Sequence, residues 1–395
     1  MRIAIVSGDD VAAEDPEQLC AALTTHGHDA TVCMRQSGRL PAHAAAAGYR
    51  RVWVPVGPSA PASPADLLPY VGDWATKLER VWSKEQPDVV HAYGWLGGLA
   101  AQLAARRRRV PVVQTFLGMA AASRPRVAES TAESPRERIE LLLARSATWA
   151  TGESSVDVDM LAHLRHSRAR VSAFTCGVDS ELYTPSGPEV ARKGRQRVLC
   201  VAPNPLQHNG FDIAIGALYR VPGAELVIAE TDATNTLHDD ARAQLQYLAK
   251  EFEVADRVHF AGTVASDELP MWIRSANVMV CTPRHPPRPT TVLQAMASGV
   301  VVVAATVGAL ADVVLDDITG VVVPPENPVG LAAALRRLLA QSFQCESMGA
   351  AGRSRAQSRF AWQRIALDAL NIYRRAGAQD RSAADLSPYG GAVMP

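Results

Sequence analysis

Residues 293–325 read LQAMASGVVVVAATVGALADVVLDDITGVVVPP. Apolar residues at helical spacing over 290–299 lead into the β-branched run 301–306, and a second such run follows at 320–325 after a polar turn. Short β-branched runs that alternate with helical segments are typical of strands buried on both faces of a parallel sheet. The stretch therefore predicts an α/β domain.

The same alternation continues outward from this stretch along the whole chain. In the second half the predicted strands are 197–203, 224–230, 258–262, 277–283, 301–306 and 320–325, and the predicted helices are 211–221, 239–252, 268–276, 290–299 and 329–341. In the first half the predicted strands are 2–8, 29–34, 50–56, 87–93, 111–116 and 147–153, and the predicted helices are 17–27, 67–85, 98–109 and 135–147. The polar, turn-rich segment 176–196 separates the halves. We therefore expect two Rossmann-like domains that face each other across a cleft, with ligands at the carboxyl ends of the strands.

Composition narrows the class of protein further. The chain has 395 residues, 48% of them hydrophobic, and its 40 basic and 40 acidic residues cancel, which argues against nucleic acid as a partner. The basic run 106–109 is interpreted as the polar end of a helix. No stretch approaches the 18 uninterrupted apolar residues of a membrane span, and we read the N-terminus as a first strand. Six scattered cysteines without metal-ligand spacing suit a reducing compartment, so we expect a cytoplasmic protein.

Several segments together resemble a known family. They are PDVVHAYGW with GLAAQLAARRRRVPVVQT within 87–115, CGVDSELYTP at 176–185, the blocks 258–283 and 293–325, and the C-terminal segment 359–375. In this order they resemble the retaining glycosyltransferases of family 4, which have the GT-B fold. The resemblance covers nearly the whole chain, and the block 258–325 is its most specific part.

The resemblance implies that the two domains bind different substrates. An N-terminal acceptor domain is expected over 1–185, completed by a C-terminal helix at about 362–376, and a nucleotide-sugar domain over 186–361. The sugar would pass from a nucleotide-diphosphate donor to an unidentified acceptor with retention of anomeric configuration, without a metal ion or other cofactor. Residues 377–395 are small, polar and turn-rich, and we expect a flexible tail.

The donor site expected in the second domain lacks its carboxylates. The family carries two Glu eight residues apart, and the matching positions here are Pro286 and Gln294. The second Glu binds the ribose hydroxyls in the family, and the Gln294 amide still offers an acceptor oxygen for them, without charge assistance. Proline offers only a carbonyl.

The turn before this helix is also altered. In the family a glycine-containing turn brings backbone N–H groups to the donor, whereas the PPRP sequence at 286–289 has three residues without N–H groups. Arg284 and Arg288 add positive charge instead. Thr290 and Thr291 open the next helix, whose N-terminus could bind phosphate; Thr290 as a plain N-cap is the alternative.

A second pair of family residues is exchanged in the loop 203–210. The family has an Arg and, five residues later, a Lys before Gly, both of which reach the diphosphate. Asn204 and Asn209 stand at those places here, and Gly210 is retained. Loss of both cations weakens neutralisation of the leaving nucleotide. His208 would compensate in part when protonated, although an exposed loop histidine is more often only solvated.

The first domain departs from the family as well. Of its glycine-rich turn after the first strand only Gly8 remains, followed by Asp9 and Asp10, which either repel a diphosphate or cap the next helix. Leu117 replaces a frequent histidine. His91, which matches a position often held by His, is the candidate catalytic residue, with a satisfied structural histidine as the alternative.

Three functions remain open from the sequence. The first is an active transferase with a rebuilt donor site that uses Arg284, Arg288 and the start of the helix at Thr290. The second is a catalytically inactive relative that binds a ligand or a partner protein. The third is a transferase whose donor has an unusual leaving group.

Overall fold

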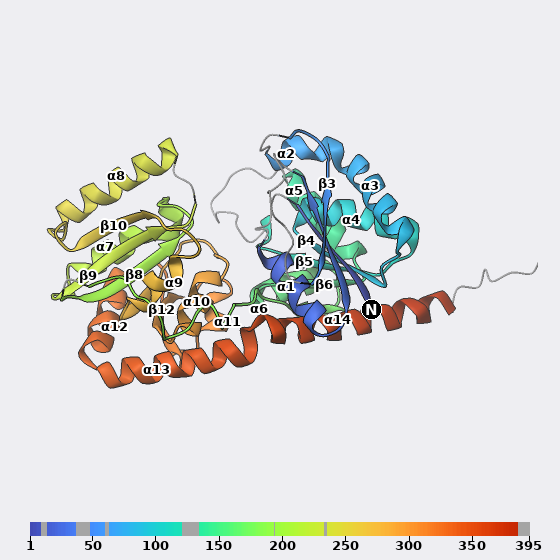
Figure 1. Cartoon of the computed structure of the whole chain (residues 1–395). Helices are drawn as coiled ribbons and strands as arrows, with labels where there is room; N and C mark the ends of the chain where they lie inside the picture. Colours follow the sequence, from blue (N-terminus) through green and yellow to red (C-terminus); the bar gives the residue numbers. More distant parts are fainter. Residues whose placement is uncertain are drawn as a thin grey trace, which may run out of the picture. The chain divides into compact units, whose positions relative to one another are not determined.

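The computed structural model describes residues 1–8, 14–36, 48–59, 63–120, 134–192, 194–232 and 235–385. The chain forms two compact units (Figure 1). Unit 1 comprises Met1–Thr175 and Trp362–Pro395, and unit 2 comprises Cys176–Ala361. The division thus falls at residue 175, where the sequence placed it at 185.

Unit 1 is built on a seven-stranded parallel sheet with the order β3-β2-β1-β4-β5-β6-β7. The strands are β1 Arg2–Ser7, β2 Asp29–Arg35, β3 Arg50–Val54, β4 Val89–Tyr93, β5 Val112–Phe116, β6 Trp149–Gly152 and β7 Val171–Ala173. Six of them coincide with predicted strands. The edge strand β7 was not predicted.

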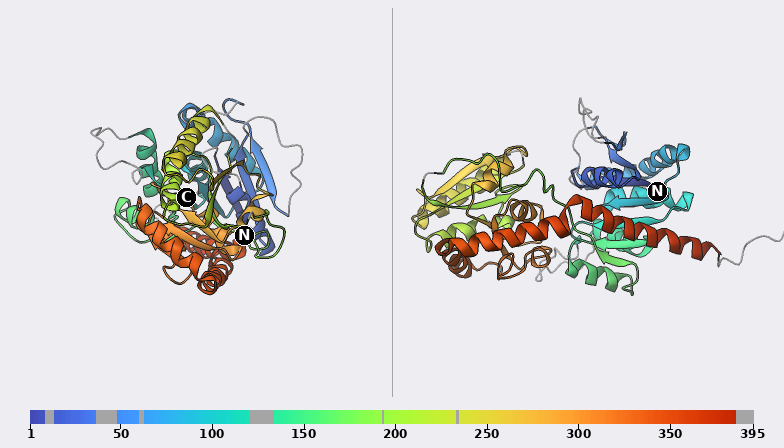
Figure 2. Two further views of the ribbon diagram at one scale, coloured as in Figure 1. Left: turned by 90° about the vertical axis from the view of Figure 1, so that its left-hand side faces the viewer. Right: turned by 60° about the horizontal axis from the view of Figure 1, so that its bottom comes forward.

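Helices cover both faces of this sheet. They are α1 Glu14–Thr25, α2 Pro64–Leu67, α3 Val71–Lys84, α4 Trp95–Arg108, α5 Pro135–Ser146, α6 Ser155–Leu164 and α14 Trp362–Asp385. One apolar cluster joins α3, α4, α5 and α6 to the sheet, and another joins α1 and α14 to the opposite face. Figure 2 shows α14 alongside the strands of unit 1.

The last helix is longer than the sequence suggested. α14 continues to Asp385 and not to residue 376, so the first part of the expected tail is helical. Residues 386–395 lie outside the described residues. Among the described helices none is both long and apolar enough to cross a lipid bilayer.

Unit 2 contains a six-stranded parallel sheet with the order β10-β9-β8-β11-β12-β13. The strands are β8 Gln196–Ala202, β9 Ala224–Glu230, β10 Val258–Thr263, β11 Val278–Cys281, β12 Val301–Ala305 and β13 Gly320–Val323. The helices are α7 Phe211–Leu218, α8 Thr236–Glu251, α9 Leu269–Arg274, α10 Thr290–Ala297, α11 Leu310–Val313, α12 Pro328–Ala340 and α13 Ser342–Arg355. All six predicted strands are present, so the predicted pair of Rossmann-like sheets is confirmed.

A buried ion pair fixes the amino-terminal edge of this second sheet. The Arg197 Nε donates to Glu225 Oε1 at 2.7 Å, and both side chains are almost fully buried. Arg197 also donates to the Ser275 hydroxyl and to two backbone carbonyls of the segment that precedes β8. Because these bonds satisfy the guanidinium inside the protein, its burial is tolerated.

Candidate functional site

The strand order of unit 2 predicts a ligand site between two loops. The order reverses between β8 and β11, and ligands of such sheets bind outside the carboxyl ends of the strands at this reversal. The loop 203–210 follows β8, and the loop 282–289 follows β11. Both loops are those in which the sequence predicted donor-binding residues.

Two amides in the first loop bind each other. The Nδ2 of Asn209 donates to both the backbone carbonyl and the Oδ1 of Asn204, each at 2.9 Å. The same Oδ1 accepts from the Leu206 N–H. Where the family resemblance implies an Arg and a Lys, this chain therefore has a pair of neutral side chains that fix the shape of the loop.

Gly210 allows the two loops to touch. Its φ of 74° is a left-handed conformation, and a Cβ at this position would overlap the Thr282 carbonyl oxygen. The Thr282 hydroxyl in turn donates to the Gly210 carbonyl at 3.3 Å. Any other residue would force the loops apart, which explains why glycine stands here although the neighbouring family residues are exchanged.

Arg284 holds the second loop to the first. Its Nη1 and Nη2 donate to the two carboxylate oxygens of Asp212 at 2.8 and 2.6 Å, its Nε donates to Glu326 Oε1 at 3.0 Å, and its Nη1 also reaches the Gln207 carbonyl. The hydrogen bond with Asp212 is the main reason that the pKa of this guanidinium is raised. Because two carboxylates already compensate its charge, Arg284 is no free cation in this structure.

The start of α10 has backbone donors without a side-chain cap. Pro289 occupies the N-cap position, so the alternative role of Thr290 as N-cap is wrong; Thr290 is the first helical residue, and its hydroxyl lies 3.7 Å from the Cys176 sulfur. Thr291 and Arg288 are partly buried nearby. The first N–H groups of a helix attract anions when no side chain satisfies them.

Gln294 lies one turn further along α10. Its Oε1 is buried and has no hydrogen-bond partner among the described residues. Side chains of a helix lean toward its N-terminus, so this oxygen is on the side of the helix start. An acceptor oxygen buried without a donor costs free energy until a ligand or water supplies one.

Pro286 packs against the neighbouring loop. A Cβ on Gly308, in the loop after β12, would lie 2.6 Å from the Pro286 Cβ. The proline ring thus occupies the space beside Gly308, and it brings no hydrogen-bonding side chain to this loop.

His91 is enclosed within unit 1. It is the middle residue of β4 and 1% exposed, with Nδ1 at 2.6 Å from the Tyr373 hydroxyl and Nε2 at 2.7 Å from the Thr115 hydroxyl. Its ring stacks on Tyr93. Burial lowers the pKa of the imidazole to about 3. Both nitrogens are satisfied inside the protein, and this geometry is that of the structural histidine and not of the catalytic candidate.

Gly8 and Leu117 lie just after β1 and β5, at the carboxyl edge of the sheet of unit 1. The Gly8 backbone is so close to α4 that a Cβ on Gly97 would lie 2.9 Å from the Gly8 nitrogen. Asp9 and Asp10 fall outside the described residues. Leu117 lines a small pocket of about 80 Å³ beside β4 and β5.

Sequence reasoning missed two residues of this pocket. Arg136 and Glu140 of α5 line it, and the Arg136 Nε donates to Glu140 Oε1 at 2.6 Å. The Glu140 carboxylate is buried and also accepts from the Ala120 N–H. The spacing of four residues between an Arg and a Glu in a predicted helix was the signal available.

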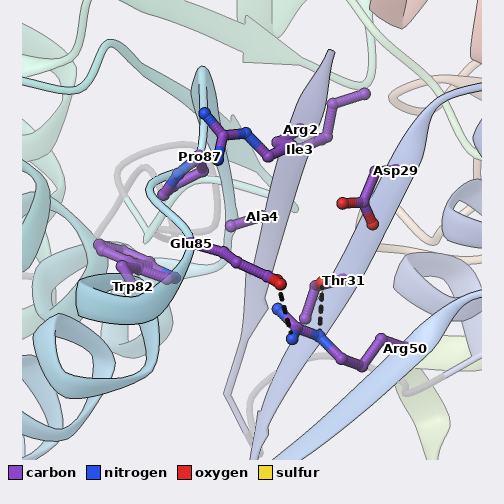
Figure 3. A pocket seen from close by; sticks show the side chains of 9 residues that line it. All are labelled: Arg2, Ile3, Ala4, Asp29, Thr31, Arg50, Trp82, Glu85 and Pro87. Carbon is purple, nitrogen blue, oxygen red and sulfur yellow. Dashed lines mark hydrogen bonds and ion pairs between the residues drawn. The ribbon is translucent and has the colours of Figure 1, made fainter.

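A second hollow lies at the opposite edge of the same sheet. Figure 3 shows Arg50 between Glu85 and Thr31, beside the first residues of β1 and β2. This hollow encloses about 20 Å³, which suits a single water molecule. Its position at the amino ends of the strands also argues against a substrate site.

The two halves of the chain match two family models. Residues 17–182 match the model described as Glycosyltransferase Family 4, and residues 188–355 match the model described as Glycosyl transferases group 1. A D-inositol 3-phosphate glycosyltransferase of Xylanimonas cellulosilytica is 29% identical over 91% of this chain and 90% of its own length. A protein of the same name from Kineococcus radiotolerans is 30% identical over 75% of this chain and 73% of its own length.

Solved structures agree on the architecture. A sucrose-phosphate synthase from Thermosynechococcus elongatus superposes with a TM-score of 0.81 at 21% identity, covering 96% of this chain and all of that one. HepE of Anabaena, in complex with UDP and glucose, superposes with a TM-score of 0.70 at 16% identity. The match covers 95% of this chain and 99% of HepE. The protein has the GT-B fold, and it belongs to glycosyltransferase family 4.

Proposed function

We infer that this protein transfers a sugar from a nucleotide-diphosphate donor to an acceptor with retention of configuration, and that unit 2 binds the donor. The observation that carries the inference is the buried Gln294 Oε1 without a partner among the described residues, on the helix whose start has no side-chain cap. A ribose hydroxyl would supply the missing donor, and a phosphate would accept from the N–H groups of α10.

Support also comes from relatives. The Anabaena protein HepE was crystallised with UDP and glucose, and the curated relatives carry the name D-inositol 3-phosphate glycosyltransferase. We extend from these names only the class of donor, a nucleotide sugar. Transfer without a metal ion is part of the same proposal, because cationic groups and a helix N-terminus would neutralise the diphosphate.

The first test is calorimetric titration of the protein with UDP, GDP, ADP and TDP. Binding of one nucleotide is expected, and Gln294→Ala should weaken it up to about tenfold, the effect of one hydrogen bond. Gln294→Glu should strengthen it, since a charged acceptor makes a stronger bond. Gln344→Ala is the matched control, because its Oε1 is also buried without a partner among the described residues of unit 2, on α13. Absence of binding at millimolar concentration would refute the proposal.

A non-catalytic role is the second candidate, and one observation favours it. Neither Asn204 nor Asn209 carries charge, and Arg284 is compensated by two carboxylates. Fewer cations remain to stabilise a leaving diphosphate. A protein that binds a nucleotide but releases no nucleotide from any sugar donor, with or without acceptors, would be assigned to this role.

A further inference from the structure

The small pocket of unit 1 lies at the carboxyl ends of β4 and β5, and all of its lining residues belong to that unit. The lining residues come from the ends of the two strands, the start of α4 and the first half of α5. They are Gly94, Trp95, Phe116, Leu117, Arg136 and Glu140. Ligands of parallel sheets bind outside the carboxyl ends of the strands, so the pocket has the position of a substrate site.

Three of the lining side chains are aromatic or aliphatic. Trp95 and Phe116 belong to the buried cluster that packs the helices on the sheet, so they form fixed walls. Leu117 is half-buried and stands where the family often has a histidine, so its side chain offers the pocket only carbon atoms. Gly94 adds no side chain. These walls favour contact with an apolar group.

The polar end of the pocket has no net charge. The Arg136 Nε donates to Glu140 Oε1 at 2.6 Å, and its Nη2 donates to the Gly118 carbonyl at 2.6 Å. The Glu140 side chain is only 4% exposed, so its carboxylate compensates the guanidinium in a poorly solvated place. Within the described part of the chain no other charged side chain lines the pocket. An incoming anion would therefore meet a buried carboxylate and an arginine that is already paired.

Glu140 can still accept a hydrogen bond from a ligand. Among the described residues its Oε1 accepts from Arg136 and its Oε2 accepts from the Ala120 N–H at 2.9 Å. A carboxylate has about four acceptor positions, so a ligand hydroxyl would find a partner here. A fully ionised phosphate has no proton to donate to it. The pocket thus distinguishes a neutral alcohol from a phosphate.

We propose that this pocket binds the alkyl end of an uncharged alcohol, which is the acceptor of the sugar, and that a hydroxyl of this alcohol donates to Glu140. The inference rests on the proposed function and names the class of its acceptor. The volume of about 80 Å³ is roughly half that of an engineered cavity of about 150 Å³ that takes up benzene. A branched alkyl group therefore fits, and a complete aromatic ring does not.

The pocket residues position the acceptor and take no part in bond making. In the transfer, an oxygen of the alcohol forms a bond to the anomeric carbon, and the bond between that carbon and the diphosphate breaks. The proton of the reacting hydroxyl passes to the departing nucleotide. Leu117 and Glu140 determine which alcohol is held in place for this step, so their substitution should alter the choice of acceptor without altering donor binding.

The experiment follows isotope-labelled leucine methyl groups of the full chain by NMR. The Leu117 resonances are those missing from the spectrum of Leu117→Ala. Isopentyl alcohol at millimolar concentration should shift them in a saturable way, whereas inorganic phosphate and D-inositol 3-phosphate should leave them in place. With the donor that calorimetry identifies, transfer to isopentyl alcohol should exceed transfer to D-inositol 3-phosphate at least about tenfold at equal concentration.

Variants, in which binding is followed on the resonances of the ligand, separate this role from a structural one. Leu117→Trp fills the pocket and should weaken the binding of isopentyl alcohol at least about tenfold, with donor affinity unchanged. Leu117→Lys adds an uncompensated cation and should create binding of D-inositol 3-phosphate. Leu142→Trp on α5 is the matched control, because Leu142 is 62% exposed and does not line the pocket; it should change neither affinity.

The outcomes distinguish the two proposals. A Leu117 shift caused by either phosphate compound, or no saturable shift with isopentyl alcohol, overturns the acceptor pocket and leaves the transferase proposal standing if a nucleotide binds. Binding of the alcohol by a protein that binds no nucleotide overturns the transferase proposal and with it the role of the pocket as an acceptor site. Thermal unfolding of each variant verifies the fold, and if Leu117→Trp does not fold, Leu117→Lys decides the specificity.

Discussion

Lowering the pH from about 7 to about 4.5 should destabilise unit 1 by about 2.7 kcal/mol through His91 alone. The pKa of this imidazole is 6.5 in the unfolded chain and is lowered by burial to about 3 in the folded protein. The unfolded state therefore binds more protons between these values, and stability falls as the pH drops below 6.5. At about pH 4.5 the unfolded imidazole is charged and the folded one is neutral; two pH units at about 1.36 kcal/mol each give the figure.

Urea unfolding followed by tryptophan fluorescence measures this loss. Six of the seven tryptophans belong to unit 1, so the signal reports mainly on that unit. His91→Gln keeps an amide donor and acceptor near Tyr373 and Thr115 but does not titrate. The native protein should lose about 2.7 kcal/mol more than the variant between the two pH values, and His166→Asn should behave like the native protein. Parallel pH profiles for the native protein and His91→Gln would refute the reasoning.

Three substitutions test other parts of the fold. Tyr373→Phe leaves the buried Nδ1 of His91 without its hydrogen bond and should cost unit 1 about 1–3 kcal/mol in urea unfolding. A cost near zero would mean that the bond is replaced by water. Gly210→Ala places a methyl group against the Thr282 carbonyl oxygen at a residue with positive φ. The substitution should cost at least about 3 kcal/mol in calorimetric unfolding of unit 2. An unchanged melting temperature would contradict the loop geometry. Arg197→Met leaves the buried Glu225 without its arginine partner and should cost about 3–5 kcal/mol at neutral pH, with recovery in the Glu225→Leu double variant.

Local sequence patterns predicted the strands of both sheets because each strand can be recognised from a few consecutive residues. The β-branched run 301–306 and its neighbours are recognisable without knowing their partners, and the parallel order follows from the intervening helices. β7 has only three residues, which are too few to show a pattern of alternating buried and exposed side chains. α6 was missed as well, although Ser154 and Asp157 form a capping box at its start.

The site was less predictable because its side chains act through distant partners. The sequence placed Arg284 in the loop after the strand at 277–283, but its carboxylate partners lie 72 and 42 residues away in the chain. The alternatives for His91 could not be separated either, since Tyr373 is 282 residues distant. That Asn204 and Asn209 bind each other depends on the turn between them, which residue type alone does not specify.

The crossing of the chain between the units has a consequence for synthesis on the ribosome. The apolar cluster of α1 needs α14 for its cover, yet α14 is translated only after the whole of unit 2. Until then Leu19, Leu23 and their neighbours on β1 lack their partners Ile365 and Leu370. The nascent first half therefore exposes this apolar face to solvent until α14 has been translated. Unit 2 is continuous in the chain and can fold before that. Chaperone dependence during translation should accordingly concentrate on the first half of the chain.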